Sequence, residues 1–201
     1  MQRIILASGS PRRRQLLDQV GIPHEVVVSN ADETIDGPPD FQVRELALRK
    51  AAAVHEMISG DAVIIAADTL VYIDGEVLGK PETPDGAFTM LKKLQGRCHT
   101  VYTGVAVLRT CDGNVLDESF VGATKVCFRE LSDHDIWAYI STGEPFDKAG
   151  AYGVQEKGAL LVDRVEGDFF TVVGLPVAKL AEILEKIGVK VWSDDLKHKE
   201  E

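Results

Sequence analysis

The sequence predicts an α/β protein in which helices flank a mixed β-sheet. Apolar runs of β type alternate with amphipathic helical segments along the chain. Several neighbouring strands are separated only by tight turns, of which Asp112-Gly113-Asn114 is the clearest, and such strands are antiparallel partners. No repeat, low-complexity segment or Pro/Ser-rich linker divides the 201 residues. A purely parallel sheet therefore does not fit, whereas a mixed sheet does.

Each predicted element has a start or stop signal. The first apolar run ends at Ser8-Gly9, after which Ser10 suits an N-cap and Pro11 the first residue of a helix. Turn dipeptides that contain glycine, such as Asp74-Gly75, mark further boundaries. These signals predict strands over 3–8, 24–29, 61–73, 98–109, 115–128, 159–166 and 168–174, the last two as a hairpin. They predict helices that begin near 11, 40, 83, 132 and 176.

The bulk properties indicate a single globular unit. We expect one domain over residues 1–188, followed by a mostly charged, loosely ordered tail over 189–201. No apolar stretch approaches the ~20 residues that span a bilayer, and the first apolar run is too short for a signal peptide, so we expect a cytoplasmic protein without a membrane partner. The formal net charge of −10 disfavours nucleic acid as a partner but leaves room for a small phosphorylated ligand.

The three cysteines, Cys98, Cys111 and Cys127, show no C-x-x-C spacing, and their odd number leaves at least one unpaired. We therefore expect reduced cysteines on strands rather than a disulfide framework. The histidines show no spacing typical of a zinc site.

The segment from Leu6 to Arg14 indicates an anion site. A strand that runs through small residues into a helix N-terminus presents free backbone N–H groups and the positive end of the helix dipole. Cations normally avoid the first helical turn, so the arginines at 12, 13 and 14 suggest a negatively charged ligand. A solvated basic turn is the alternative.

Two ionisable residues fall within apolar patterns. Lys50 lies four residues from both Leu46 and Val54 on the apolar face of its helix, where it either points into a pocket or reaches out to solvent. Asp68 interrupts an apolar strand, which costs several kcal/mol unless the carboxylate is paired or metal-bound, and such groups cluster at active sites. Because no arginine is adjacent to Asp68, we expect its carboxylate to be free of tight ion pairing.

Two further segments carry candidate ligand groups. The stretch before Lys80 resembles a P-loop, but its spacing is one residue short and Pro81 follows the lysine, so Lys80 is expected only to contribute a charge. The small residues of segment 147–155 would let a ligand approach the backbone, with Tyr152 and Gln155 placed to read a nucleobase edge. A flexible surface loop is the alternative for this segment.

Together these segments resemble the Maf family of nucleotide pyrophosphatases. The resemblance covers Ile4 to about Gly188, and its motifs occur in the family's order and spacing. It implies a fold similar to that of inosine triphosphate pyrophosphatases, with two lobes around a cleft, and a homodimer. The motifs are Ser8-x-Ser10-Pro11-Arg12-Arg13, Ala67-Asp68-Thr69, Gly79-Lys80-Pro81, Asp147-Lys148-Ala149-Gly150-Ala151-Tyr152-x-x-Gln155 and Gly174-Leu175-Pro176.

The resemblance also implies an activity. It is the hydrolysis of a nucleoside triphosphate between the α and β phosphates, with Mg²⁺ or Mn²⁺ as the cofactor. Matching positions make Asp68 the proton acceptor and place Glu33 and Asp68 at the metal. Arg12, Thr69 and Gln155 match the trio that marks the branch acting on dTTP and UTP. The full implied site is catalytic Asp68, Glu33 and Lys80, with substrate held by Ser8, Arg12, Arg13, Lys50, Thr69, Lys148 and Gln155.

Two other functions remain open at this point. A nucleotide-binding regulator of cell division would bind nucleotide without releasing pyrophosphate, and substitution of Asp68 would leave its effect intact. A nucleotidyltransferase would use the same phosphate pocket but would need a second substrate. A screen of nucleoside triphosphates with pyrophosphate detection separates these hypotheses.

Overall fold

The computed structural model describes residues 2–111 and 114–192, so the predicted turn at 112–113 and most of the predicted tail lie outside the described residues. The strands are β1 (Ile4–Leu6), β2 (Glu25–Val26), β3 (Val63–Ile73), β4 (Glu76–Leu78), β5 (Cys98–Cys111), β6 (Asn114–Phe128) and β7 (Val162–Glu166). The α-helices are α1 (Pro11–Gln19), α2 (Pro39–Met57), α3 (Pro84–Leu94), α4 (Asp133–Ile140), α5 (Phe169–Val173) and α6 (Val177–Lys186). Short 3-10 helices are η1 (Glu144–Asp147), η2 (Ala149–Ala151) and η3 (Glu156–Leu161).

The strands form one mixed sheet in the order β2-β1-β3-β5-β6-β7, with β4 also paired to β3. Strand β1 runs parallel to β2 and β3, whereas the remaining pairs are antiparallel. The prediction of a mixed sheet is confirmed. Helical crossovers join the parallel strands, whereas only two residues separate β3 from β4 and β5 from β6, which are antiparallel.

The edge of β3 opposite β5 is shared by two short strands. β1 pairs with it over 63–65 and β4 over 71–73, while β5 covers the other edge from Val63 to Tyr72. Among the described strands, none pairs with the first edge between Ile65 and Val71. We call this stretch, Ala66–Leu70, the open edge of β3.

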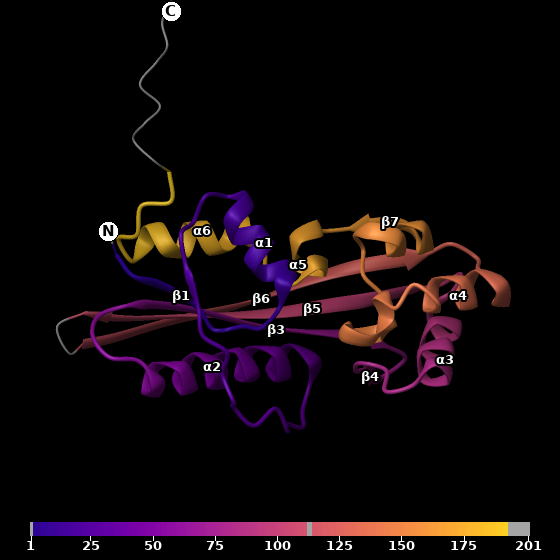
Figure 1. The fold of residues 1–201 in the computed structure, drawn as a ribbon, viewed down its shortest axis with the longest axis horizontal. Helices are drawn as coiled ribbons and strands as arrows, with labels where there is room; N and C mark the ends of the chain where they lie inside the picture. The colour runs from indigo at the N-terminus through magenta and orange to yellow at the C-terminus, as the bar shows by residue number, and fades with distance from the viewer. Residues whose placement is uncertain (1, 112–113, 193–201) are drawn as a thin grey trace, which may run out of the picture.

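Helices cover both faces of the sheet (Figure 1). Helix α2 packs against one face around Ile64, Ala66 and Ala106. Helices α1 and α6 pack against the other face around Ile65 and Val105. Helices α3 and α4 lie at one end of the sheet and form a separate apolar cluster with the ends of β3 and β5 (Figure 1). The long strands β5 and β6 run through both parts, consistent with two lobes built on one sheet.

A glycine allows α2 to approach the sheet closely. Gly104 of β5 lies beside Asp68 in the register, and a Cβ atom there would lie only 2.2 Å from the backbone oxygen of Val43 in α2. The α2 backbone therefore rests directly on β5 at this point. Because Lys50 follows Val43 by two helical turns on the same face, its side chain is directed along the sheet toward Asp68.

The prediction of a second hairpin strand at 168–174 is wrong. Strand β7 pairs with β6 as an edge strand, but the chain then enters helix α5. The Asp168 carboxylate accepts hydrogen bonds from the backbone N–H groups of Phe170 and Thr171 and so caps the helix. This cap outweighs the strand preference of the β-branched residues that follow. The helix predicted to begin near 132 is confirmed as α4, which starts with a capping box between Ser132 and Asp135.

The prediction of reduced cysteines is wrong for one pair. Cys98 and Cys127 face each other across β5 and β6 and form a disulfide, while Cys111 is not in a disulfide. The two cysteines are 29 residues apart, so only the register of the hairpin brings them together. Motif spacing along the sequence does not reveal such a pair.

Val189 is the first residue of the predicted tail. It is buried and packs in the cluster of α1 and α6. Residues 193–201 lie outside the described residues. Within the part of the chain that the structure describes, no helix is long and apolar enough to cross a membrane.

Candidate active site

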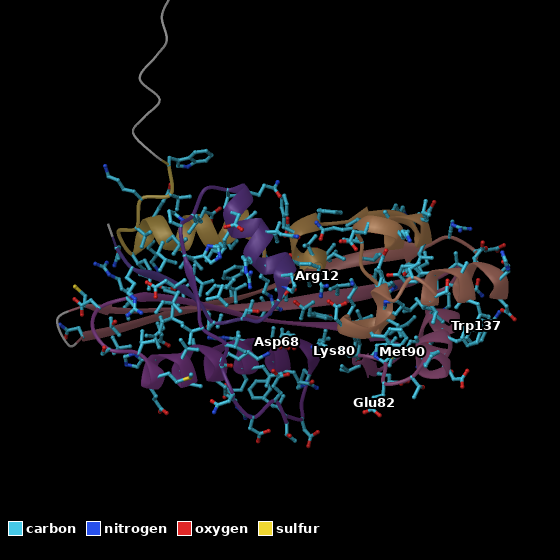
Figure 2. The ribbon with its side chains drawn as sticks, viewed as in Figure 1. Arg12, Asp68, Lys80, Glu82, Met90 and Trp137 are labelled. Carbon is cyan, nitrogen blue, oxygen red and sulfur yellow. A yellow bond between two sulfur atoms is a disulfide. The ribbon has the colours of Figure 1, made fainter. Side chains whose placement is uncertain are left out.

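A cavity of about 660 Å³ opens beside the open edge of β3. It lies just beyond the carboxyl end of β1, the position at which α/β sheets usually bind ligands. Residues of the β1–α1 loop, α2, β3, the segment after β4 and segment 147–155 line it. Arg12, Asp68 and Lys80 lie together near the middle of the molecule, whereas Trp137 lies at one end (Figure 2).

All ten residues of the predicted site line this one cavity: Ser8, Arg12, Arg13, Glu33, Lys50, Asp68, Thr69, Lys80, Lys148 and Gln155. They come from segments that are far apart in the sequence. Their cations outnumber their carboxylates, and when Asp147 is included the lining carries five cations and three carboxylates. The cavity therefore has a positive excess in a chain of net charge −10, which suits a polyanionic ligand.

Asp68 and Lys50 form the most enclosed ion pair of the cavity. The Lys50 ammonium lies 2.6 Å from the Asp68 carboxylate and 2.9 Å from that of Glu33. The side chains of Lys50 and Asp68 are only 11% and 15% exposed, whereas Glu33 is largely exposed. The expectation that Asp68 is free of tight ion pairing is wrong, because its partner comes from α2 rather than from a neighbouring position in the sequence. Of the two readings for Lys50, the pocket is correct.

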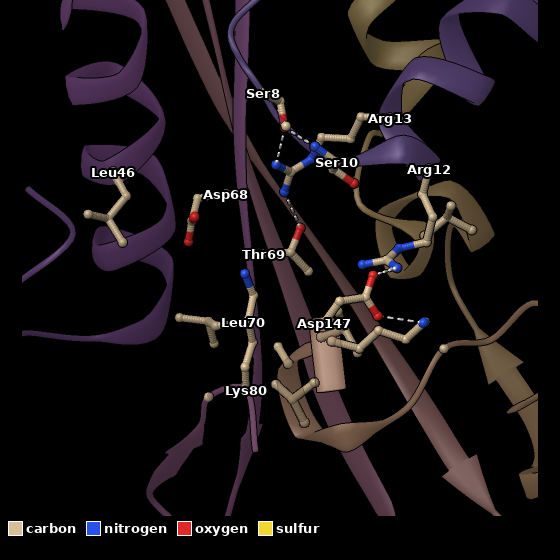
Figure 3. A pocket seen from close by; sticks show the side chains of 18 of the residues that line it. Ser8, Ser10, Arg12, Arg13, Leu46, Asp68, Thr69, Leu70, Lys80 and Asp147 are labelled. Carbon is tan, nitrogen blue, oxygen red and sulfur yellow. Dashed lines mark hydrogen bonds and ion pairs between the residues drawn. The ribbon is translucent and has the colours of Figure 1, made fainter. Parts of the chain in front are cut away.

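Arg13 ties three segments together at the back of the cavity (Figure 3). Its guanidinium donates to the hydroxyl of Ser8 at 3.0 Å, to the hydroxyl of Thr69 at 3.1 Å and to the carbonyl of Gly174 at 2.8 Å. Burial lowers the pKa of the Arg13 guanidinium, and the negative charges of Asp68 and Glu33 act in the opposite direction. No carboxylate among the described residues forms an ion pair with Arg13. Its charge is therefore available to an anion in the cavity.

Asp147 holds two of the predicted phosphate-binding cations (Figure 3). Its carboxylate lies 2.8 Å from Arg12 and 2.7 Å from Lys148. Burial acts to raise the pKa of Asp147, but the hydrogen bonds from Lys148 and Arg12 prevail and hold that pKa below its usual value. Asp147 lies in one of the family motifs, but its sequence position alone indicated no role. Its position directly before Lys148 was the one available signal.

Lys80 and Gln155 are the uncommitted polar side chains of the site. Both line the cavity, and Lys80 extends into it from below Leu70 in Figure 3. Within the described ranges, neither side chain makes a hydrogen bond or an ion pair with the protein. Both can therefore contact a ligand without losing an existing partner.

Tyr152 lines the cavity, but its hydroxyl group is engaged inside the protein. Tyr152 is buried, and its hydroxyl is 2.7 Å from the Nε2 atom of His99 inside the protein. Its ring packs against those of His99 and Phe128. The glycine at position 150 likewise serves packing, because its φ is +67° and a Cβ atom would lie 2.9 Å from the Val71 side chain.

The cavity offers two carboxylates, Glu33 and Asp68, as candidate ligands for a divalent metal. Among the described residues, no group of three or more His, Cys, Asp or Glu side chains gathers at one point. Glu33 and Asp68 nevertheless place two carboxylates around a single cation, the Lys50 ammonium. Mg²⁺ is commonly held by one or two carboxylates together with water and substrate phosphates. The residues present therefore fit a metal that is bound jointly with a phosphorylated ligand.

Comparison of the sequence with known proteins shows the family to which the chain belongs. The family model described as "Maf-like protein" matches residues 3–187, which is nearly the whole chain. The chain belongs to the Maf-like family. All five sequence motifs of the resemblance fall within the matched range, and the Maf-like fold positions their charged residues around the one cavity.

Curated relatives are similar over almost their full length. The chain is 50% identical to the "dTTP/UTP pyrophosphatase" of Moorella thermoacetica, over 96% of this chain and 98% of that protein. It is 48% identical to the protein of that name from Thermoanaerobacter sp. (strain X514), over 92% of this chain and 96% of the relative. A Bacillus cereus (strain ATCC 14579) relative of the same name is 45% identical, over 95% and 98%.

A solved structure supports the fold. The Ham1 protein of Staphylococcus aureus superposes with a TM-score of 0.50, covering 92% of this chain and 100% of that chain. At 15% sequence identity the similarity concerns the fold alone. It confirms the expected Maf/Ham1-like arrangement of a mixed sheet flanked by helices.

Proposed function

We propose that this Maf-like protein hydrolyses dTTP and UTP to the nucleoside monophosphate and pyrophosphate. The observation that carries the proposal is the enclosed Asp68 carboxylate at the open edge of β3, beside a cavity with an excess of positive charge. A tetra-anionic triphosphate needs cations from several directions, together with a base that can take a proton from water. The names of the similar proteins support the same activity.

The proposed reaction is the attack of water on the α phosphorus. A bond forms between the water oxygen and the α phosphorus, the bond from that phosphorus to the bridging oxygen breaks, and pyrophosphate leaves. Asp68 accepts the proton that water loses. Arg12, Arg13 and Lys148 neutralise the phosphates, and Lys80 approaches the leaving pyrophosphate as an uncommitted cation.

Metal dependence is part of the proposal. Glu33 and Asp68 would hold Mg²⁺ or Mn²⁺ together with the phosphates, because their two carboxylates already surround a single cation. When bound, the metal would neutralise charge on the phosphates. Lys50, which bridges both carboxylates in the ligand-free protein, would then be free to turn toward a phosphate oxygen.

Gln155 is proposed to contribute to base choice. Its uncommitted amide can donate to a pyrimidine carbonyl or accept from the N3–H group of uracil or thymine. The homodimer and the cytoplasmic location remain predictions that follow from the family resemblance and from the sequence.

A substrate screen tests the function and the role of Gln155. Wild-type protein with Mg²⁺ is given dTTP, UTP, CTP and GTP, and both pyrophosphate and phosphate are measured. We expect pyrophosphate as the product, with dTTP and UTP preferred. Gln155→Ala should narrow the differences in kcat/KM among bases more than it slows the best substrate.

Gln42→Ala is the matched control for this screen. Gln42 lines the same cavity, but its amide already donates to the Gly37 carbonyl at 2.7 Å, so base preference should be unchanged. A preference of the wild type for GTP, or release of phosphate instead of pyrophosphate, would contradict the proposed function.

A further inference from the structure

A chain of hydroxyl groups lies behind Thr69. Thr69 of β3 and Thr103 of β5 are direct partners in the sheet, and their hydroxyl oxygens are 2.8 Å apart. The Thr103 hydroxyl is also 2.7 Å from the backbone carbonyl of Thr171 in α5. Thr103 is completely buried, so it does not line the cavity itself.

The Thr171 carbonyl at one end of this series of hydroxyl groups and the Arg13 guanidinium at the other determine the direction of each hydrogen bond in the series. A carbonyl oxygen only accepts, so Thr103 must donate its single hydroxyl proton to Thr171. Thr103 then has only lone pairs to offer, so Thr69 must donate its proton to Thr103. A guanidinium only donates, so Arg13 occupies one lone pair of Thr69.

Thr69 therefore has a single unused hydrogen-bonding position, which is a lone pair. Because Thr69 lines the cavity, a ligand group that contacts its hydroxyl must be a donor. The opposite holds for Ser8, whose oxygen accepts from Arg13 and from the Ser10 backbone, so that its proton is left for an acceptor such as a phosphate oxygen.

We propose that Thr103 is a positioning residue that makes Thr69 an obligatory acceptor, and that Thr69 thereby selects the N3–H group of uracil and thymine over cytosine. This inference deepens the proposed function and rests on it for the identity of the ligand. Cytosine carries an unprotonated N3, which would set two lone pairs against each other. Thr69 cannot turn its proton toward that nitrogen without leaving the buried acceptor Thr103 without its donor.

The test compares three variants in steady-state kinetics with dTTP, UTP and CTP. Thr103→Val keeps the shape of the side chain but removes the hydroxyl, which frees the Thr69 proton to face the cavity. We expect the ratio of kcat/KM for UTP to that for CTP to fall about tenfold, the scale of one discriminating hydrogen bond. Thr103→Ser keeps the hydroxyl and should retain the wild-type ratio.

Thr124→Val is the control for a merely structural effect. Thr124 is also a buried threonine whose hydroxyl donates to a backbone carbonyl, that of Asp168 at 2.9 Å. Like Thr103 it does not line the cavity, but unlike Thr103 it makes no hydrogen bond with Thr69. This variant should leave the UTP-to-CTP ratio unchanged. The inference would be overturned if Thr103→Val left the UTP-to-CTP ratio of kcat/KM unchanged, or if Thr124→Val changed that ratio equally. It would also be overturned if the wild type showed no preference for UTP over CTP.

Failure of the proposed function would be recognised separately. If the wild type releases no pyrophosphate from any of the three nucleotides, hydrolysis between the α and β phosphates is excluded. The ratio of the Kd values of UTP and CTP is then measured by calorimetry instead. The same drop in Thr103→Val is then expected for binding. Equal ratios in the wild type and Thr103→Val would overturn the role of Thr103 there too.

Discussion

The Lys50 ammonium lies 2.6 Å from the carboxylate of Asp68 and 2.9 Å from that of Glu33, so one cation bridges the two acidic residues of the site. A carboxylate buried to the extent of Asp68 would be destabilising without such a partner. The ion pair with Lys50 therefore offsets the cost of burying the Asp68 carboxylate when no ligand is bound. It also keeps both carboxylates at the position where a divalent cation and a triphosphate would need them.

Removal of divalent metal should abolish turnover. The cations of the cavity exceed its carboxylates by only two charges, which is less than the charge of a nucleoside triphosphate. Activity is measured with excess chelator and again after Mg²⁺ or Mn²⁺ is restored. We expect loss and recovery, and full turnover in excess chelator would contradict metal assistance.

Substitution of Asp147 should strengthen nucleotide binding. If Arg12 and Lys148 hold phosphates as proposed, the Asp147 carboxylate competes with the ligand for both cations. Its side chain is half exposed, so Asp147→Asn should cost little stability. We expect the Kd of a dTTP analogue with a non-hydrolysable α–β bridge to fall about two- to fivefold, the scale of one exposed ion pair, by calorimetry in the presence of Mg²⁺.

Asp163→Asn is the control for the Asp147 experiment. Asp163 has nearly the same side-chain exposure, 55% against 56%, and pairs with Arg164 outside the cavity. It should leave the Kd unchanged. Weaker binding by Asp147→Asn would mean that Asp147 orients the two cations rather than competing for them.

Acid should destabilise the fold through His99. Burial lowers the pKa of His99 from 6.5 to about 4. Between these two pH values the unfolded chain binds a proton that the folded chain excludes, so the stability is fully present above about pH 6.5 and falls as the pH drops toward 4. We expect this residue alone to reduce the free energy of unfolding by about 2 kcal/mol from pH 7 to pH 5.

His99→Gln provides the comparison for that pH dependence. It retains a polar group for the Tyr152 hydroxyl but does not titrate. Urea unfolding of both proteins at pH 7 and pH 5 gives the difference. The same loss of stability in wild type and variant would show that other groups cause it.

Local sequence patterns predicted much of the fold but few of the side-chain contacts in the site. The start signals at Ser10, Thr83 and Ser132 correctly placed three helices, because a helix start depends on residues adjacent in sequence. The contacts of Lys50 with Asp68 and of Thr69 with Thr103 depend on helix-to-sheet packing and on register. Spacing along the chain does not encode either, which is why Asp68 was expected to be unpaired and Thr103 was overlooked.

The 168–174 segment shows the opposite failure. Its β-branched residues favour a strand locally, but the Asp168 cap and the burial of Thr171 and Val173 make it a helix. That helix supplies the carbonyl that directs the hydroxyl chain behind Thr69. An error in one element of secondary structure thus concealed a feature of the site.

The most direct test of the proposed function is the turnover of Asp68→Asn. The amide keeps the shape and one acceptor for Lys50 but cannot take a proton from water. With saturating dTTP or UTP and Mg²⁺, we expect pyrophosphate release to fall at least ~10²-fold in kcat while nucleotide binding and the fold are retained. Glu33→Gln is measured in parallel, since near wild-type turnover by Asp68→Asn would contradict the role of Asp68 as the base and transfer it to Glu33.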